Sequence, residues 1–545
     1  MLDGEPFQIR SGELHYNRIP QIYWRDRMEK CLALGLNTVC TYVFWNEHER
    51  EPGEWDFSGN RDLRAFVQLA QELGLWVLLR PGPYVCSEWD WGGLPYWLAN
   101  IPGMAIRQLN EPFLQATENY MAKVAEQTAD LTIERGGPIL MVQVENEYGS
   151  FGNDHVYMGA IRDIVRRVGF DGTLFTSDGP TPEMLAGGTL PDIVAVVNFG
   201  SRPEERFKVF EEFRPCAPKM CGELWFGWFD HWGVPHHVTD LEQQAKDLEW
   251  FMETGASFNI YMVHGGTNWG FMNGANWTPD GYRPDTTSYD YDAAIAEDGR
   301  LTPKYFAFRD VVARKVGNLP DPPPELPRIE LPDLEFASSC PLESVAVEVG
   351  EGWRSMEEVG VGHGAILYRI QLPGPGRGML RLEGLQDFAA VVSMGRVQAT
   401  LDRRLGEFEA PVEHDGAIDL YVENSGRINY AREMLAERKG VVGATLDGAR
   451  LENVAVFRLD FQAAKFSPGG SRAVPALYRS EFRLDALGDA CLDMSGWGKG
   501  NVWVNGFNLG RHWSIGPQRS LFCPANCLRT GMNEVVVLEL LSRLG

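Results

Sequence analysis

The first 319 residues alternate short apolar segments with amphipathic ones, and this alternation restricts the fold more than any other feature of the chain. Eight β-forming segments are expected as strands, at 7–16, 38–45, 75–81, 139–147, 173–177, 193–199, 219–225 and 258–264. Segments with helical spacing lie between or after them, at 24–34, 62–73, 112–133, 156–168, 182–185, 204–213, 241–253 and 303–316. Eight successive strand-then-helix units predict an α/β fold, the (β/α)8 or TIM barrel.

A doubly wound open sheet also alternates strands with helices and is the main alternative. As a nucleotide-binding protein it would need a Gly-rich phosphate-binding turn after an early strand, and the sequence has none. The expected strands are apolar almost to their ends, as parallel strands covered on both faces should be. We therefore predict a barrel, in which the functional side chains follow the C-terminal ends of the strands.

The pattern changes at the stiff, proline-rich linker 320–327, PDPPPELP. Short alternating segments with Gly-rich turns follow, which predict β-sandwiches. A weak repeat relates Tyr368 to Tyr478 and Gly395 to Gly506. We predict a barrel domain at 1–319, a linker and first all-β domain at 320–455, and a second all-β domain at 456–545. Both all-β domains would be jelly-roll sandwiches, a type that recurs in sugar-binding domains, and the sequence leaves open whether they bind sugar or only support the barrel.

Composition excludes several classes of function. The net charge of −25 argues against nucleic acid and anionic membranes as partners, since both require a basic surface. We find no apolar stretch long enough to cross a bilayer and no secretory signal. The nine scattered cysteines suit reduced thiols in a cytoplasmic protein. His15, His48 and His231 match no ligand spacing, so we predict no metal and no cofactor.

Carboxylates follow two of the expected strands. Glu145 and Glu147 come after the fourth, where strand alternation would place them on one face and Asn146 on the other. Glu223 closes the seventh and is followed by Trp225, Trp228 and Trp232. Aromatic rings can stack on the apolar face of a pyranose, although such clusters also form ordinary cores. The same caution applies to the two glutamates after the fourth strand, one of which could simply pair with an arginine.

Glu147 and Glu223 are the natural pair for glycoside hydrolysis with retention. That reaction needs one carboxylic acid to protonate the leaving oxygen and a second carboxylate, about 5 to 5.5 Å away, to attack the anomeric carbon. The ends of strands four and seven face each other across a barrel mouth. The charge of Glu223 should raise the pKa of Glu147 and keep it protonated as the acid. Glu145 is expected to be structural.

Several motifs together resemble glycoside hydrolase family 35, bacterial type, which comprises β-galactosidases that act from the non-reducing end. They are SGELHYNRIP, TYVFWNEHE, RPGPYVCSEWDWGGLP, GGPILMVQVENEYGS, GELWFGWFDHWG, HGGTNWGFMNGAN and TSYDYDAAIAEDG. The resemblance covers the barrel, which it implies is the catalytic domain, and the two sandwiches also look like the jelly-roll, galactose-binding-like β-domains of the family. It implies that Glu147 is the acid/base and Glu223 the nucleophile. The substrate-binding positions that it implies are Tyr42, Cys86, Ser87, Glu88, Asn146, Trp228, Tyr261 and Tyr291.

Within this set, Asn146 matches the residue that hydrogen-bonds the sugar 2-hydroxyl, Tyr261 lies near the nucleophile and Trp228 forms an aromatic wall. Glu88 could instead pair with Arg80, and Tyr42 could be ordinary packing. The loop 277–286 is slightly longer than in animal relatives and should shape the side of the leaving group.

The expected function is an exo-acting, retaining β-galactosidase of the cytoplasm, with a small galactoside or oligosaccharide as its partner and a homodimer as one option. Two alternatives stay open. The same fold could act on another β-glycoside such as a glucosaminide, or the chain could be a galactose-binding protein without activity.

Overall fold

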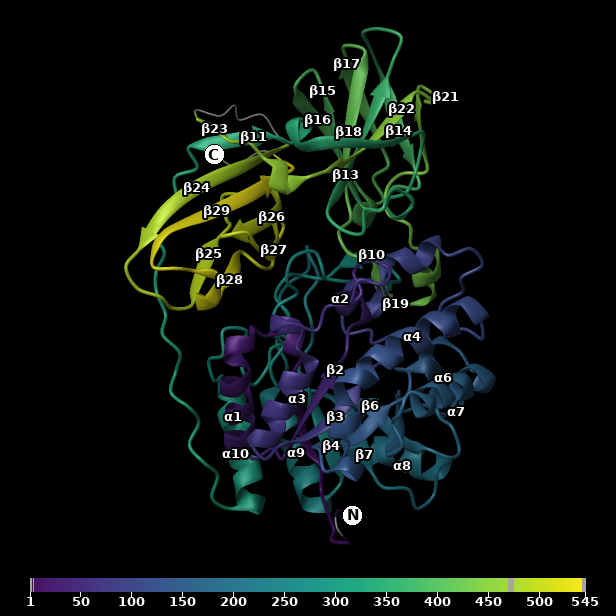
Figure 1. Cartoon of the computed structure of the whole chain (residues 1–545), viewed down its shortest axis with the longest axis vertical. Helices are drawn as coiled ribbons and strands as arrows, with labels where there is room; N and C mark the ends of the chain where they lie inside the picture. Colours follow the sequence, from purple (N-terminus) through teal and green to yellow (C-terminus); the bar gives the residue numbers. More distant parts are fainter. Residues whose placement is uncertain (1, 3, 469–474, 542–545) are drawn as a thin grey trace.

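The computed structural model describes residue 2 and residues 4–468 and 475–541. Its first part is a closed barrel of parallel strands that pair in sequence order (Figure 1). The strands are β1 (Arg10–Glu13), β2 (Thr38–Tyr42), β3 (Trp76–Arg80), β4 (Ile139–Gln143), β5 (Thr173–Asp178), β6 (Val194–Phe199), β7 (Met220–Trp225) and β8 (Ser257–Tyr261). The predicted (β/α)8 barrel is therefore confirmed.

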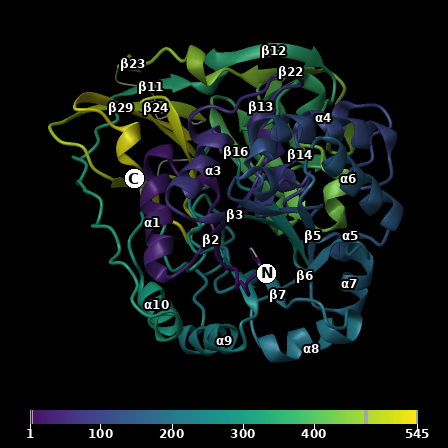
Figure 2. The ribbon, with the colours of Figure 1, turned by 60° about the horizontal axis from the view of Figure 1, so that its bottom comes forward.

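Helices surround the barrel and cover its outer face (Figure 2). They are α1 (Trp24–Leu34), α3 (Leu63–Glu72), α4 (Glu111–Thr128), α6 (His155–Arg167), α7 (Pro182–Gly188), α8 (Pro203–Phe213), α9 (Leu241–Thr254) and α10 (Pro303–Val316). Two short helices, α2 (Trp45–His48) and α5 (Tyr148–Phe151), instead follow the C-terminal ends of β2 and β4. Asp62, Asn110 and Asp154 each accept a hydrogen bond from a backbone N–H of the helix that follows, which fixes where α3, α4 and α6 begin.

The helix expected over 112–133 is shorter in the structure. It ends at Thr128, whose φ of −136° leaves the helical region, and two separate 3-10 turns follow at Ala129–Leu131 and Ile133–Arg135. A residue outside the helical φ range breaks the ladder of backbone hydrogen bonds, so the helix cannot continue through it.

The chain beyond the linker forms two β-modules. The first comprises a six-stranded sheet (β12-β22-β13-β18-β15-β16) and a four-stranded sheet (β17-β14-β20-β21). The second comprises a six-stranded sheet (β23-β11-β24-β29-β26-β27) and a two-stranded sheet (β25-β28). The strands are β11 (Ser338–Pro341), β12 (Ala346–Glu351), β13 (Ala365–Gln371), β14 (Gly376–Glu383), β15 (Phe388–Ser393), β16 (Arg396–Asp402), β17 (Glu409–His414), β18 (Ala417–Glu423), β20 (Gly443–Leu446), β21 (Ala449–Arg450), β22 (Val454–Leu459), β23 (Ser467–Pro468), β24 (Ala476–Leu484), β25 (Ala490–Asp493), β26 (Lys499–Val504), β27 (Phe507–Trp513), β28 (Ser520–Cys523) and β29 (Gly531–Glu539).

The weak sequence repeat corresponds to a repeated strand order. In the first module β13 pairs with β18, which pairs with β15 and then β16; in the second, β24, β29, β26 and β27 follow in the same order. Tyr368 lies on β13 and Tyr478 on β24. Gly395 and Gly506 occupy the turns of the two corresponding hairpins, where their φ values of 70° and 85° favour glycine. The two modules are therefore related in architecture.

One strand crosses between the modules. β11 precedes the whole first module in sequence, yet it pairs with β24 in the sheet of the second. The second module thus takes strands from two separate parts of the chain. The domain bounds 1–319, 320–455 and 456–545 stay predictions, but the sheet of the second module includes residues before 455.

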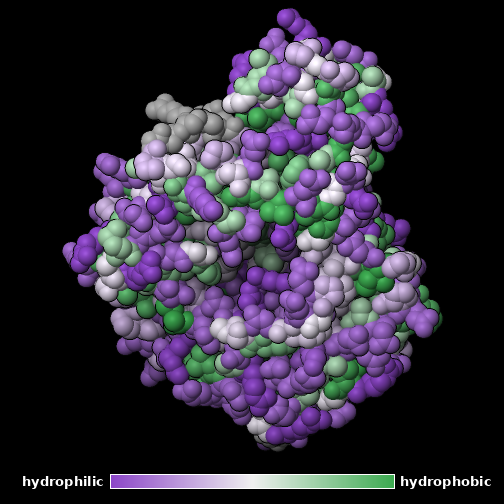
Figure 3. All heavy atoms as spheres, turned by 45° about the horizontal axis from the view of Figure 1, so that its top comes forward, coloured by the Kyte–Doolittle hydropathy of each residue, from purple (hydrophilic) through white to green (hydrophobic). Residues whose placement is uncertain are grey.

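The first module also joins the barrel. Its short strand β19 (Ile428–Tyr430) pairs with β9 (Ala275–Thr278), which forms a hairpin with β10 (Gly281–Pro284) beyond the end of β8. Figure 1 shows both modules on the same side of the barrel, opposite the N-terminus. Seen from that side, the surface is largely hydrophilic and has a hollow near its middle (Figure 3). Within the described ranges, no helix has the length and apolar character needed to span a membrane.

Candidate active site

A cavity of about 330 Å³ lies at the C-terminal ends of the barrel strands. All ten predicted site residues line it: Tyr42, Cys86, Ser87, Glu88, Asn146, Glu147, Glu223, Trp228, Tyr261 and Tyr291. The other lining residues are Val85, Trp225, Phe229, His231, Asn276, Trp277, Thr278 and Tyr430. The fold therefore brings the predicted residues together, while their individual roles stay predictions.

Glu223 lies on β7 and is held by three hydrogen-bond donors. The Tyr42 hydroxyl donates to Oε1 over 2.6 Å, the Trp225 indole N–H donates to Oε2 over 3.0 Å, and the Arg80 guanidinium also bonds to Oε1. Donors and a positive charge favour the ionised form of a carboxyl group. The carboxyl group of Glu223 is therefore fixed in orientation by contacts from β2, β3 and its own strand.

Arg80 entered the sequence analysis only as an alternative partner of Glu88. It does not pair with Glu88. Its guanidinium bonds instead to Glu13, at 3.0 Å, and to Glu223. Arg80 is the last residue of β3, and its side chain reaches across the barrel interior. Its position at a strand end was the only signal in the sequence, because its partners are distant in the chain.

The strand expected over 139–147 stops at Gln143, and this corrects the predicted orientation of the glutamates. Glu145 and Glu147 have φ values of 59° and 47°, so both leave the extended conformation. Alternation along a strand therefore does not apply to them. Glu145 points away from the cavity and pairs with Arg107, whereas Glu147 lines the cavity.

Glu147 lies in very different surroundings from Glu223. One hydrogen bond reaches its carboxyl group within the described part of the chain, from the Asn198 side-chain amide at 3.0 Å. Burial, followed by the negative charge of Glu223, raises its pKa to about 8. The predicted charge repulsion is present, but burial is the larger cause. At neutral pH the carboxyl group of Glu147 therefore favours its protonated form.

The side chain of Asn146 is fixed by hydrogen bonds to its oxygen atom. Its Oδ1 accepts hydrogen bonds from Gln143 at 2.9 Å and Arg80 at 3.0 Å, and it lies 2.8 Å from the Tyr42 hydroxyl, whose one proton it shares with Glu223. With the oxygen fully engaged, the amide N–H₂ group, which has a long 3.4 Å bond to the Val85 carbonyl, is the part that can donate to a ligand.

Three consecutive residues after β3 form one wall of the cavity. Cys86, Ser87 and Glu88 all have positive φ values, 59°, 58° and 47°, which turn the backbone sharply after β3. Burial raises the pKa of Glu88 to about 7, and its carboxyl group accepts a hydrogen bond from the Tyr289 hydroxyl. Asn429 of the first β-module contacts both Cys86, at 3.4 Å, and Glu88, at 3.5 Å.

Ser87 connects this wall to the aromatic residues. Its hydroxyl oxygen accepts hydrogen bonds from Arg18 at 2.8 Å and from the Tyr261 hydroxyl at 3.2 Å. The rings of Tyr261 and Tyr291 meet edge to face, with centroids 5.5 Å apart. These contacts fix the aromatic wall of the cavity.

The tryptophans that follow Glu223 do not form one platform. Trp225 and Trp228 line the cavity, and Trp228 is 38% exposed, which places it at the rim. Trp232 does not belong to this cavity. It is fully buried beside Phe388 and Trp513 of the β-modules, so it is part of the contact between domains.

The three histidines make local hydrogen bonds. His15 contacts Glu13 at 3.2 Å, His48 bonds to Tyr16 and to the Asp56 carbonyl, and His231 bonds to Asn276 at 2.8 Å. A search of the described ranges finds no group of three or more His, Cys, Asp or Glu side chains arranged to hold a metal ion.

Trp277, Thr278 and Tyr430 complete the rim of the cavity and were not predicted as site residues. Trp277 and Thr278 lie on β9, within or beside the loop that the sequence associates with the leaving group. Tyr430 lies on β19 and comes from the first β-module, which gave no sequence signal for a place beside the carboxylates.

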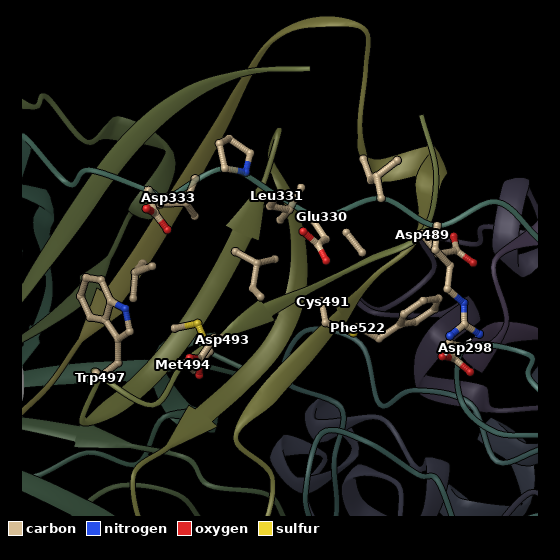
Figure 4. A pocket seen from close by; sticks show the side chains of 18 of the residues that line it. Asp298, Glu330, Leu331, Asp333, Asp489, Cys491, Asp493, Met494, Trp497 and Phe522 are labelled. Atoms are coloured by element: carbon tan, nitrogen blue, oxygen red, sulfur yellow. Dashed lines mark ion pairs between the residues drawn. The ribbon is translucent and has the colours of Figure 1, made fainter. Parts of the chain in front are cut away.

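A larger cavity, about 900 Å³, lies between residues 328–336 and the second β-module (Figure 4). Acidic side chains surround it, but two of them already have structural partners. Asp298 pairs with Arg328 at 3.1 Å, and Asp489 bonds to the backbone N–H of Ala525 at 2.9 Å. The first contact joins the barrel to the segment after the linker, and the second lies within the second module. The cavity at the barrel mouth contains the predicted carboxylates and is therefore the candidate active site.

Comparisons with known proteins agree with this geometry. Residues 1–315 match the family model described as Glycosyl hydrolases family 35. Residues 354–460 match "Beta-galactosidase, first all-beta domain", and residues 475–533 match "Beta-galactosidase, galactose-binding domain". Similar proteins include a Beta-galactosidase of Xanthomonas manihotis, 45% identical over 95% of this chain and 89% of the relative.

Two mammalian relatives extend the similarity along almost the whole chain. Beta-galactosidase-1-like protein 2 of Homo sapiens is 39% identical over 99% of this chain and 88% of its own length. A Beta-galactosidase of Mus musculus is 38% identical over 99% of this chain and 90% of its own length. A family match across the entire barrel, together with relatives that align through both β-modules, shows that the chain is a glycoside hydrolase and belongs to glycosyl hydrolases family 35.

Proposed function

We propose that this chain is an exo-acting, retaining β-galactosidase that hydrolyses terminal non-reducing β-D-galactose through a covalent galactosyl-enzyme. Membership of family 35 and similarity along nearly the whole chain to proteins named Beta-galactosidase support the activity. The two β-modules match domains described for β-galactosidases, which supports the same assignment.

The observation that carries the mechanism is the contrast between two carboxyl groups in one cavity. Burial and the charge of Glu223 raise the pKa of Glu147 to about 8, so Glu147 holds a proton at neutral pH. Glu223 accepts hydrogen bonds from Tyr42, Trp225 and Arg80, which favour its anion. A proton donor and a nucleophile facing one sugar are the two groups that a retaining glycosidase requires.

In the first step, an oxygen of Glu223 forms a bond to the anomeric carbon while the bond from that carbon to the leaving oxygen breaks. The proton of Glu147 passes to that oxygen, and the released sugar or alcohol departs. Glu223 is now a neutral ester, so its charge no longer raises the pKa of Glu147. Glu147 then accepts a proton from water, whose oxygen displaces Glu223 and restores the original anomeric configuration.

The other predicted residues hold the galactose unit. Asn146 donates its amide N–H to the 2-hydroxyl, and Tyr42, Glu88 and Tyr291 line the pocket for the ring. Cys86 and Ser87 turn the chain so that Glu88 faces the sugar, while Tyr261 and Trp228 provide aromatic surface. The cavity of about 330 Å³ suits one terminal sugar unit, which supports exo action.

The test of the two roles is chemical rescue. Changing Glu223→Gly should abolish turnover, and added azide should restore it with α-galactosyl azide as the product. Azide rescue of Glu147→Gly on an activated galactoside should instead give the β-azide. Opposite anomers, identified by NMR, would reverse the assignment of the acid and the nucleophile.

A substrate panel tests the sugar. We expect nitrophenyl β-galactoside to be hydrolysed far faster than the glucoside, fucoside and glucosaminide. Faster hydrolysis of the glucosaminide would show that the substrate is a glucosaminide. Galactose binding without turnover between about pH 4 and 8 would show that the chain is a binding protein.

The proposal includes a cytoplasmic location and, as one option, a homodimer. All nine cysteines are free thiols, and the net charge of −25 is unsuited to nucleic acid or an anionic membrane. Cell fractionation and light scattering test these two points.

A further inference from the structure

We propose that Arg107 is a positioning residue for the acid/base, acting through Glu145 to hold the turn that aims the carboxyl group of Glu147. The inference rests on the proposed function, because it concerns how that function keeps its proton donor in place. Arg107 does not line the cavity, and nothing in its sequence surroundings, between the strand-three loop and α4, singles it out.

The contact is a two-point ion pair. The Nε and Nη2 atoms of Arg107 each donate to one oxygen of Glu145, both over 2.8 Å. Both side chains are almost completely buried, Glu145 at 0% and Arg107 at 2% exposure. Two parallel bonds define both distance and orientation, as a single bond cannot.

The same guanidinium reaches the backbone of the catalytic turn. Nη2 of Arg107 also donates to the carbonyl oxygen of Asn146, over 2.8 Å. That carbonyl belongs to the peptide unit that leads into Glu147. Arg107 is thus bonded to the residues on the N-terminal side of Glu147, and a change at Arg107 can reorient Glu147 without touching it.

The turn needs such support because its backbone is unfavourable. Glu145 and Glu147 both lie in the left-handed region, with φ values of 59° and 47°, and neither is glycine. Side chains with a β-carbon rarely adopt this region, so surrounding contacts must hold them there. The carboxyl group of Glu147 cannot supply this support, since its one hydrogen bond in the described ranges goes to Asn198.

The surroundings of Arg107 fix the guanidinium plane in turn. Its central carbon lies 3.7 Å from the Tyr84 ring centroid and 4.4 Å from that of Phe151. The Tyr157 hydroxyl donates to Glu145 over 3.1 Å. A lysine would keep the charge but lose the planar, two-point contact.

The dependence of the rate on the leaving group distinguishes positioning from general stabilisation. The constant kcat/KM reports steps up to departure of the leaving group. The 2,4-dinitrophenolate group of a dinitrophenyl galactoside departs without a proton, whereas the 4-methoxyphenolate group of a methoxyphenyl galactoside must be protonated as it leaves. If Glu147 is misdirected, kcat/KM should therefore fall mainly for the methoxyphenyl substrate.

We expect Arg107→Ala to lower kcat/KM for the methoxyphenyl substrate at least tenfold more than for the dinitrophenyl substrate. Arg107→Lys should give a smaller effect of the same kind, and Glu145→Gln tests the partner if Arg107→Ala does not fold. Azide, which needs no general base, should raise kcat of Arg107→Ala on the dinitrophenyl substrate.

The control is Arg61→Ala. It also removes an ion pair of a buried glutamate in the barrel, the 2.9 Å contact with Glu47, but neither residue lines the cavity. It should affect both substrates equally. Equal losses in the Arg107 and Glu145 variants would overturn the inference and leave the proposed function intact. If the wild-type protein hydrolyses neither substrate, the proposed function fails and the inference fails with it.

Discussion

Four groups around Glu147 tune its protonation in addition to burial. Glu223 and Asp178 are negative charges that raise its pKa, whereas the hydrogen bond from Asn198 and the positive charge of Arg80 stabilise the anion and lower it. Asp178 is itself buried, which raises its own pKa to about 7. Asp178, Asn198 and Glu223 lie on β5, β6 and β7, so three consecutive strands of the barrel adjust the protonation of Glu147.

Changing Asn198→Ala should move the basic limb of the pH profile of kcat/KM upward by about 0.5 to 1 pH unit. The variant loses a donor worth about 1 kcal/mol to the anion, so Glu147 keeps its proton to higher pH. Asp178→Asn removes a negative charge and should shift the limb downward. Profiles between pH 5 and 10 that move together, or not at all, would contradict this account of Glu147.

At the scale of elements, β19 explains why a β-module contributes to the barrel mouth. Arg427, just before β19, pairs with Asp90 at 3.1 Å and with Glu357 at 2.6 Å, and all three side chains are buried. Asp90 follows Glu88 by two residues in the chain. The pairing of β19 with β9 then places Tyr430 at the cavity rim.

Arg427→Ala should destabilise the protein by about 3 to 5 kcal/mol, because it leaves two carboxylates buried without their cation. Guanidinium unfolding followed by tryptophan fluorescence measures the change. The control Arg369→Ala breaks a partly exposed pair with Asp419 and should cost no more than about 1 kcal/mol. Similar losses for the two variants would show that β19 does not depend on this ion pair.

Across the whole molecule, buried carboxyl groups with raised pKa values link stability to pH. Burial is the first cause in each case: the pKa is about 8 for Glu147 and about 7 for Glu88, Asp178 and Glu539. Such groups keep protons in the folded state that they lose in the unfolded state. Their contribution to stability is therefore complete at low pH and is lost as pH rises through the folded-state pKa.

Buried histidines act in the opposite direction at lower pH. Burial lowers the pKa of His48 and of His512 to about 4 in the folded protein. As the pH falls below 6.5, these histidines are therefore protonated in the unfolded chain before they are in the folded protein, which lowers stability. Above pH 6.5 an unfolded histidine is at most half protonated, so the opposing contribution of His48 and His512 diminishes as the pH rises to 8, while that of the carboxyl groups grows.

The free energy of unfolding should thus fall between pH 6.5 and 8, by about 1 kcal/mol for each of these carboxyl groups. Urea unfolding at several pH values in this range measures the slope. Glu539→Gln removes one contributor and should make the slope shallower, whatever its effect on absolute stability. A slope that is flat or rises with pH would refute this linkage.

The sequence by itself determined the barrel and the related β-modules, because these depend on patterns within single segments. The set of residues expected at the cavity came from the resemblance of its motifs to family 35. Alternating strand and helix periods define the barrel, and polar residues after apolar strands mark its C-terminal mouth. The repeated tyrosine and glycine positions predicted two similar modules, and the strand order agrees with them.

Only the tertiary structure decided which side chains meet. Arg80 reaches Glu223, Arg107 holds Glu145, β11 joins the distant second module, and Tyr430 arrives from another domain. Each of these depends on contacts between residues far apart in the chain. Periodicity describes one segment at a time, so it can indicate which face of an element is buried, but not which partner that face or strand end will find.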